Sequence, residues 1–328
     1  MWTGDQARNW YAGRPWPVGC NYFPATAVNP IEMWRAETFD PGAIARELAV
    51  AAGLGFNSVR TNLHYLVWET DPAGQRARLD VFLELAAAHG ISTMVNFFDD
   101  CAHSGQQPKL GPQEPPVPGV HNSRWTPSPG HDLVRDRTRW AGLERFVTET
   151  VRAFATDLRI IAWDLYNEPG AAGLEEASLP LLEAVFCWAR AANPSQPLTT
   201  GIWNDGFKKL NAATVALSDI VSFHNYGSLD AVERQVATLK KTGRPLLCTE
   251  WLARGRGSTV SAILPFFKRE RIGAYNWGLV NGKTQTHFPW NSPAGAPEPD
   301  PWHHDLYRRD GTPYRPAELL ELKKIISG

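Results

Sequence analysis

Hydrophobic positions fall into short runs rich in β-branched and aromatic residues, separated by longer segments with helical periodicity. Each run has the length and composition of a buried strand. Eight strands are predicted in this way: Pro15–Phe23, Phe56–Leu63, Ile91–Phe98, Arg159–Pro169, Gln196–Trp203, Asp219–Tyr226, Arg244–Trp251 and Ile272–Leu279.

A helix is predicted after every strand. The first begins at Pro41, with Asp40 as its N-cap and Gly53 and Gly55 near its end. The others are predicted at Gln75–His89, Arg137–Thr156, Leu179–Asn193, Ala212–Leu217, Leu229–Thr242, Thr259–Glu270 and Arg315–Ile326. Apolar strands alternating with amphipathic helices indicate a parallel sheet covered by helices.

Eight such units in 328 residues predict an α/β fold, a (β/α)8 TIM barrel, with residues 1–328 forming a single catalytic domain. The rival is a doubly wound open sheet, which usually carries a Gly-rich turn after its first strand. The segment after the first strand, NYFPATAVNPIEMW, has no GxGxxG. Long loops follow strands 3 and 8, at Asp99–Asp136 and Val280–Tyr314. They are predicted to wall a site on the C-terminal face of the barrel.

The composition of the chain argues against some classes of binding partner. The net charge of -1 gives no electrostatic attraction for nucleic acid or anionic lipid. No apolar run reaches the length of about 18 residues that a transmembrane helix needs. The 14 Trp residues need an explanation, and stacking platforms for flat apolar ligand faces, such as sugar rings, are one, which makes a carbohydrate substrate a candidate partner. The sequence indicates no oligomeric state.

The beginning of the chain, MWTGDQARNWYAG, lacks the basic and apolar regions of a secretory signal. We therefore expect a cytoplasmic protein, with a secreted or periplasmic location as the alternative if a signal has been removed. No metal and no cofactor is expected, because the sequence has no CxxC, HExxH, P-loop or GxSxG motif. The four cysteines are far apart and are expected to be reduced: Cys20, Cys101, Cys187 and Cys248.

Two carboxylates end predicted strands. Glu168 lies in WDLYNEP at the end of strand four, and Glu250 lies in LLCTEW at the end of strand seven. These strands lie on opposite sides of an eight-stranded barrel, so the side chains would converge across its mouth. Cleavage of an acetal needs one group to protonate the leaving oxygen and another to attack the anomeric carbon or activate water. A strand-end salt bridge is the alternative for either residue alone.

The NEP motif after strand four and the Glu ending strand seven resemble the signature of retaining β-glycosidases of glycoside hydrolase clan A, with family 5, the cellulase-like group, most similar. The resemblance covers the predicted barrel from Pro15 to Leu279. It implies that Glu168 is the general acid/base and Glu250 the nucleophile of a double displacement. It also implies that Asn167 hydrogen-bonds the sugar 2-hydroxyl.

Four further residues match the family one by one. His224 and Tyr226 share one face of strand six, as in the family's His-x-Tyr. The resemblance implies that Arg60 on strand two and Tyr226 hold the nucleophile, and that His224 lies by the acid/base. It also implies that Trp277 is the platform beneath the sugar. We accordingly expect a raised pKa at the acid/base and a low pKa at the nucleophile beside Arg60.

One position departs from the family pattern. Many members carry a His near the end of strand three, where this chain reads NFFDDCAH. Asp99 and Asp100 are the nearest polar groups, with His103 beyond them. A carboxylate can bind two sugar hydroxyls at once, so both residues are candidates for substrate binding. Because the chain departs from the family pattern here, the identity of the substrate is left open.

Two other functions remain possible from the residues alone. One is a carbohydrate-binding barrel that has lost catalysis, against which both glutamates and their supporting residues argue. The other is a barrel enzyme of different chemistry, such as an aldolase, which would want a Lys at a strand end; none is present. Among hydrolases, the long loops favour exo-action or short oligosaccharides. An open cleft would instead favour an endo-β-1,4-glucanase, mannanase or xylanase.

Overall fold

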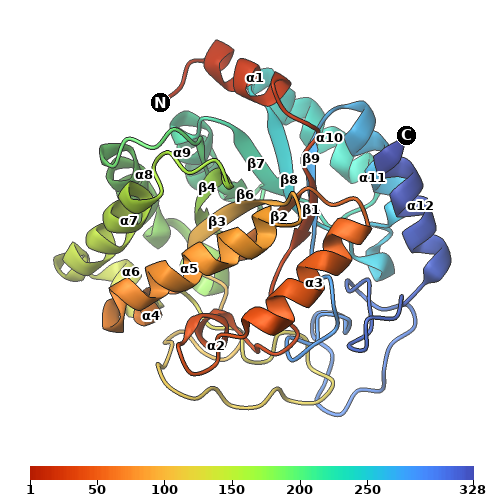
Figure 1. Ribbon diagram of the computed structural model, residues 1–328. Coiled ribbons are helices and arrows are strands. Elements are labelled where there is room, and N and C mark those ends of the chain that lie inside the picture. Colours follow the sequence, from red (N-terminus) through yellow and green to blue (C-terminus); the bar gives the residue numbers. More distant parts are fainter.

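A computed structural model describes residues 1–328. One parallel sheet closes into a barrel with the strand order β5-β4-β3-β2-β1-β9-β8-β7-β6 (Figure 1). The strands are β1 (Val18–Asn21), β2 (Ser58–Asn62), β3 (Ser92–Asp99), β4 (Ile160–Asn167), β5 (Leu198–Thr199), β6 (Gly201–Ile202), β7 (Val221–His224), β8 (Leu246–Trp251) and β9 (Gly273–Asn276).

The fifth predicted strand, Gln196–Trp203, is divided at Thr200. Its first half, β5, pairs with β4, and its second half, β6, pairs with β7. The chain therefore changes partner at Thr200 and joins the two ends of the sheet. Counting β5 and β6 together, eight strands form the ring, which confirms the predicted (β/α)8 barrel.

Helices surround the sheet. All the helices predicted after the strands are present, although those expected to begin at Gln75, Arg137 and Ala212 begin instead at Pro72, Ala141 and Lys208. Asp40 and Asp71 cap helix N-termini with their side chains, and a proline occupies the first turn of each of these two helices. The helices that follow the strands are α3 (Pro41–Gly53), α5 (Pro72–Ala87), α7 (Ala141–Ala153), α8 (Leu179–Ala191), α9 (Lys208–Leu217), α10 (Leu229–Leu239), α11 (Val260–Arg269) and α12 (Pro316–Ser327). Four more were not predicted: α1 (Gly4–Ala12), α2 (Pro30–Trp34), α4 (Tyr65–Thr70) and α6 (His131–Arg135).

The helix α1 lies across one end of the barrel, and the long loops lie at the other end (Figure 1). Thr3 and Gln6 form a capping box at its start. Its residues Ala7 and Tyr11 are buried in a small apolar cluster with residues from the beginnings of the strands, which include Met94 and Ile161. The larger apolar core fills the layer between the sheet and the helices.

The two long loops contact each other directly (Figure 1). The Asn122 N–H donates to the Thr284 carbonyl at 2.8 Å, and the Gly295 N–H donates to the Pro118 carbonyl at 2.8 Å. The Gln285 side chain also donates to two carbonyls of the first loop. Both loops are therefore parts of one wall on the C-terminal face of the barrel.

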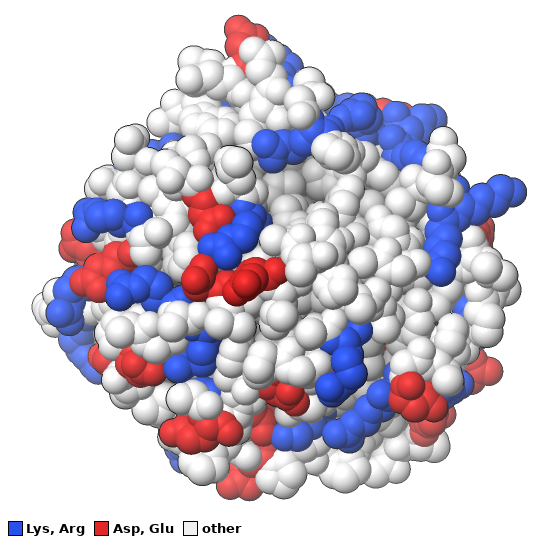
Figure 2. All heavy atoms as spheres, viewed as in Figure 1, with Lys and Arg blue, Asp and Glu red and all other residues white.

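On the face seen in Figure 2, acidic and basic side chains are interspersed. This mixture agrees with the near-zero net charge of the chain. None of the helices has both the length and the apolar character needed to cross a lipid bilayer.

Candidate active site

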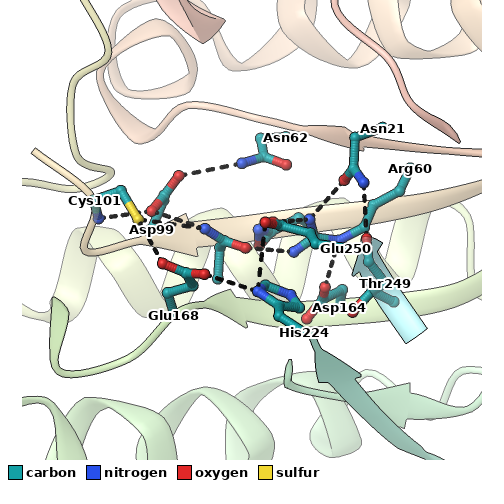
Figure 3. Close-up of polar contacts among 12 residues, drawn as sticks. Asn21, Arg60, Asn62, Asp99, Cys101, Asp164, Glu168, His224, Thr249 and Glu250 are labelled. Carbon is teal, nitrogen blue, oxygen red and sulfur yellow. Dashed lines mark hydrogen bonds and ion pairs between the residues drawn. The ribbon is translucent and has the colours of Figure 1, made fainter. Parts of the chain in front are cut away.

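Arg60 lies at the centre of a buried polar network at the mouth of the barrel (Figure 3). Its Nε donates to Asp164 Oδ2 at 2.7 Å. Its Nη1 donates to Asn21 Oδ1 at 2.8 Å and to Glu250 Oε1 at 2.9 Å, and its Nη2 donates to Asn167 Oδ1 at 2.6 Å. Burial opposes the charged form, but the two carboxylates raise the pKa of Arg60 above its usual value. This fixed cation orients strands β1, β2, β4 and β8 around the site.

Glu250 lies near the end of β8 and accepts strong hydrogen bonds on both oxygens. Arg60 binds Oε1, and the Tyr226 hydroxyl donates to Oε2 at 2.7 Å. The Glu250 side chain is only 6% exposed. The structure thus brings Arg60 and Tyr226 together around this carboxylate.

Glu168 directly follows β4 and has a left-handed backbone, with φ 44°. A non-glycine residue in this region carries strain that the surrounding structure must hold. Its Oε1 lies 2.9 Å from His224 Nδ1, and its Oε2 lies 3.1 Å from the sulfur of Cys101. The side chain is 17% exposed and lines a cavity. It is thus more accessible than Glu250.

His224 lies between the two glutamates. Its Nδ1 is 2.9 Å from Glu168 and 3.5 Å from Glu250 Oε2, whereas its Nε2 is buried without a partner. Burial lowers the pKa of His224 to about 4, so the ring is neutral, and the single proton belongs on Nδ1, where both neighbours are acceptors. Gly201 makes room for the ring, since a Cβ built there would lie 2.8 Å from Nε2.

The two carboxyl groups face each other across the cavity. Oxygens of Glu168 and Glu250 and a ring nitrogen of His224 all lie within 4.8 Å of one another. Burial raises the pKa of both glutamates, and the low pKa expected for Glu250 is therefore wrong. Its donors, Arg60 and Tyr226, are nevertheless stronger than the thiol and imidazole that serve Glu168. These donors favour the ionised form of Glu250.

These three side chains also form the one cluster of possible metal ligands. Both oxygens of Glu250 are already occupied by Arg60 and Tyr226. A bound cation would have to displace these donors and would lie close to the Arg60 guanidinium. The side chains around Glu250 therefore suit a carboxylate held by hydrogen bonds from the protein better than a carboxylate that binds a metal ion.

Asp99, the last residue of β3, supports the site from behind. Its Oδ1 accepts from Asn167 Nδ2 at 3.1 Å, and its Oδ2 accepts from the Trp125 indole at 2.9 Å and from Asn62 at 3.3 Å. Asp99 is buried and does not line the cavity. Burial raises the pKa of its carboxyl to about 6. The structure therefore places Asp99 where it orients Asn167 and Trp125.

Asp100 points to the other side of β3, away from the cavity. Its oxygens accept from the Tyr166 hydroxyl at 2.6 Å, the Gly170 N–H at 2.7 Å and the Ser178 hydroxyl at 2.5 Å. Burial raises the pKa of this carboxyl to about 7. Because Gly170 lies two residues after Glu168, Asp100 anchors the turn that carries that glutamate.

Aromatic side chains form one side of the cavity, which has a volume of about 940 Å³. Trp277 follows β9 and packs edge-on against Trp125 at 5.7 Å between ring centroids. Phe23 packs against both rings. Trp290, from the second long loop, lies edge-on against Tyr226 at 4.9 Å. Trp277 lines the cavity, and each long loop adds a tryptophan to the lining, Trp125 from the first and Trp290 from the second.

The sequence analysis missed several residues that contact the site. Asp164 was missed although it is a charged residue inside an otherwise apolar strand, a pattern that marks a buried polar partner. Asn21 ends β1, where Asn is exceptional in an apolar run. Cys101 was considered only as a reduced thiol, because it lies in the irregular loop that follows β3.

A closed parallel barrel with two facing carboxyl groups at its C-terminal mouth is the architecture of a glycoside hydrolase. The family described as Cellulase (glycosyl hydrolase family 5) matches residues 26–283. The chain therefore belongs to glycoside hydrolase family 5. No curated protein matches it significantly in sequence.

Solved structures share the fold at low sequence identity. GH5_18 from Streptomyces cattleya in complex with GlcNAc is 15% identical, with a TM-score of 0.64 over 96% of this chain and 80% of that one. The exo-β-1,4-mannosidase Op5Man5 from Opitutaceae bacterium strain TAV5 is 18% identical, with a TM-score of 0.64 over 95% and 59% of the two chains. An endo-1,4-β-mannanase from Eisenia fetida is 11% identical, with a TM-score of 0.59 over 96% and 92%.

Proposed function

We propose that this chain is a retaining glycoside hydrolase that cleaves β-linked glycosides by double displacement, with Glu250 as the nucleophile and Glu168 as the acid/base. The observation that carries the proposal is the facing pair of carboxyl groups, with oxygens within 4.8 Å. Retaining enzymes hold their two carboxyl groups about 5–5.5 Å apart, whereas inverting enzymes need about 6.5–9.5 Å to admit a water molecule.

In the first step, Glu250 attacks the anomeric carbon while Glu168 gives its proton to the leaving oxygen. Arg60 and Tyr226 hold the attacking carboxylate in place and keep it ionised. Asn167, held by Arg60 and Asp99, is oriented to bond the sugar 2-hydroxyl. The bond from carbon to the leaving oxygen breaks, an ester to Glu250 forms, and the aglycone departs with the proton.

In the second step, Glu168 acts as the base and removes a proton from the water that attacks the anomeric carbon. The bond from that carbon to Glu250 breaks, and Glu250 leaves as a carboxylate. Esterification of Glu250 removes a negative charge within 4.8 Å of Glu168. The pKa of Glu168 then falls, because the like charge that disfavours its carboxylate form is gone. The same carboxyl group therefore serves as acid and then as base.

The joined loops support exo-action on a short substrate. They wall the cavity on the side of Trp125 and Trp277, whereas the side near Trp203 is lined by exposed residues such as Lys208. We propose that a terminal sugar occupies the walled side and that the aglycone leaves past Trp203. An inactive carbohydrate-binding barrel has no comparable support, because both glutamates and their partners are in place.

The stereochemical course of hydrolysis tests the mechanism. Proton NMR on a β-glycoside should show the β-anomer as the first product; an initial α-anomer would overturn the assignment. The Glu250→Ala variant should lose turnover, and azide should restore it by forming the α-glycosyl azide. The Glu168→Ala variant should retain most activity on aryl glycosides with good leaving groups. If neither variant loses activity on an unactivated substrate, the pair is not catalytic.

The product length tests exo-action. Manβ1-4GlcNAc, the disaccharide bound in one structural neighbour, belongs in the panel together with β1-4 mannan, glucan and xylan oligosaccharides and the corresponding polymers. Release of single sugars from short chains, read by chromatography, is the expected result. Internal cleavage of polymers into mixed oligosaccharides would show an open cleft and an endo-acting enzyme instead.

A further inference from the structure

A cysteine thiol lines the cavity beside Glu168. The Sγ atom of Cys101 lies 3.1 Å from Glu168 Oε2 and 3.8 Å from Asn167 Nδ2. Figure 3 shows the thiol on the side of the Glu168 carboxyl opposite to His224. The position of Cys101 is fixed by its own backbone, since its N–H donates to Asp99 Oδ1 at 2.8 Å. The contact therefore belongs to an ordered network.

The chemistry of the contact allows one direction of donation. Burial and the charges of Asp99 and Glu168 raise the pKa of the Cys101 thiol well above its ordinary value, so the sulfur keeps its proton. When Glu168 is ionised, its carboxylate has only acceptors, so the S–H group then donates to Oε2. His224 donates to the other oxygen from Nδ1. Two donors from different elements thus hold the two oxygens of one carboxyl group.

We propose that Cys101 is a positioning residue, whose S–H bond to Oε2 holds the Glu168 carboxyl in the orientation that transfers a proton to the glycosidic oxygen. This inference rests on the proposed role of Glu168 as acid/base. The thiol bond strengthens as Glu168 becomes a carboxylate, which is the state it reaches when the leaving oxygen takes the proton. Cys101 therefore stabilises the transition state of the first step more than the resting acid.

The position of Cys101 also explains the departure at the end of strand three. There the sequence has DDC where a His is expected from the family pattern. Asp99 turns inward to bind Asn167 and Trp125, and Asp100 turns outward to Ser178. Of these three residues, only Cys101 reaches the cavity.

The pH profile of kcat/KM provides a readout that simple packing would not change. Its upper limb reports the acid form of Glu168 in the free enzyme. The other ionisable groups that face Glu168 stay in place in every Cys101 variant: Arg60 on β2, Asp99 on β3, His224 on β7, Tyr226 after β7 and Glu250 on β8. A shift of that limb is therefore assigned to the thiol.

The test compares Cys101→Ala with Cys101→Ser on one aryl glycoside with a poor leaving group. Loss of the donor in Cys101→Ala should move the upper limb upward by about 0.5–1 pH unit, the equivalent of one net hydrogen bond. It should also lower kcat/KM by roughly 3–10-fold, because the lost bond strengthens in the transition state. Cys101→Ser keeps a donor and should restore both the limb and most of the rate.

Cys187→Ala is the matched control, because Cys187 is an exposed free thiol on α8, outside the cavity. Its profile should coincide with that of the unchanged protein. An unshifted limb in Cys101→Ala would overturn the inference, and so would equal losses in the Ala and Ser variants. Glu168→Gln separates the two proposals. If that variant keeps its activity and its upper limb, the acid/base assignment fails; if only the Cys101 variants show no shift, this inference alone fails.

Discussion

The two ends of the barrel are built from opposite chemistry. At the end covered by α1, Ala7 and Tyr11 pack on apolar side chains from the beginnings of the strands. At the mouth, the buried Arg60 guanidinium binds two carboxylates and two amides. When an apolar contact loses one partner, the protein loses stability in proportion to the apolar area that is exposed. A buried charge depends on every partner, because a lost one leaves its neighbours unpaired.

This difference implies that the mouth and the α1 end respond differently to substitution. Changes under α1 should lower stability without affecting the reaction. Changes in the Arg60 network should affect both, since the groups that maintain the fold there also touch the glutamates. The predictions below test this separation.

The largest effect is expected from Arg60→Met. Asp164 and Glu250 would then be buried without their cation, which destabilises proteins by about 3–5 kcal/mol. Turnover should fall by roughly three orders of magnitude or more, because the attacking carboxylate loses its position and its charge stabilisation. Urea unfolding and steady-state kinetics measure the two losses. A stable and active Arg60→Met protein would show that the network is dispensable.

At the other end, Tyr11→Ala should give a large loss of stability alone. The ring is buried, and its hydroxyl donates to the Arg271 carbonyl at 2.7 Å. Removal of a buried aromatic side chain costs about 3–5 kcal/mol. The values of kcat and KM, measured well below the unfolding temperature, should equal those of the unchanged protein. A change in kcat would show that the two ends are coupled through the barrel.

A smaller effect is expected from Gly201→Ala, which acts on the site through packing. The added Cβ would lie 2.8 Å from His224 Nε2, so the ring must move. Overpacking of this kind costs about 1–3 kcal/mol. The pH profile of kcat/KM should also change, because the hydrogen bond from His224 to Glu168 would be distorted. Gly53→Ala, at an exposed position at the end of α3 where an added Cβ would meet no atom within 4 Å, is the control and should neither lower stability nor change the pH profile.

The last effect is a gradual one and concerns the pH dependence of stability. The pKa of Asp100 rises from 3.8 to about 7 on folding, so the folded state binds more protons between these values. The free energy of unfolding should therefore decrease as the pH rises from about 4 to 7, by at most about 1.4 kcal/mol per pH unit from this group. Asp100→Asn should flatten the curve. An unchanged slope in urea titrations would show that Asp100 does not titrate in this range.

Much of the fold was predictable, because buried parallel strands produce continuous apolar runs and the helices between them carry caps such as Asp40 and Asp71. The exact ends of the strands could not be predicted. Residues Pro15–Pro17 and Tyr22–Phe23 belong to the same apolar run as β1, yet they lie outside its ladder. The helix α1 was missed because only two of its residues are buried, which is too few for a clear periodic signal.

The places of Glu168 and Glu250 near strand ends, and that of Arg60 within β2, could be predicted from the pattern of the strands. Alternation of side chains along a strand tells which residues face inward. The alternation continues just beyond β3, where Asp99 faces the site, Asp100 faces away and Cys101 lines the cavity. The alternation of side chains also does not predict a pKa, because the raised pKa of Glu250 depends on how completely its carboxyl group is buried.

The hydrogen bonds between the two long loops have a consequence for engineering of specificity. Asn122 and Thr284 are far apart in sequence but are joined through their backbones, as are Pro118 and Gly295. A loop grafted from a related enzyme onto one side alone would leave donors and acceptors of the other side without partners. Transplants intended to reshape sugar preference should therefore exchange both segments together, as a single cassette.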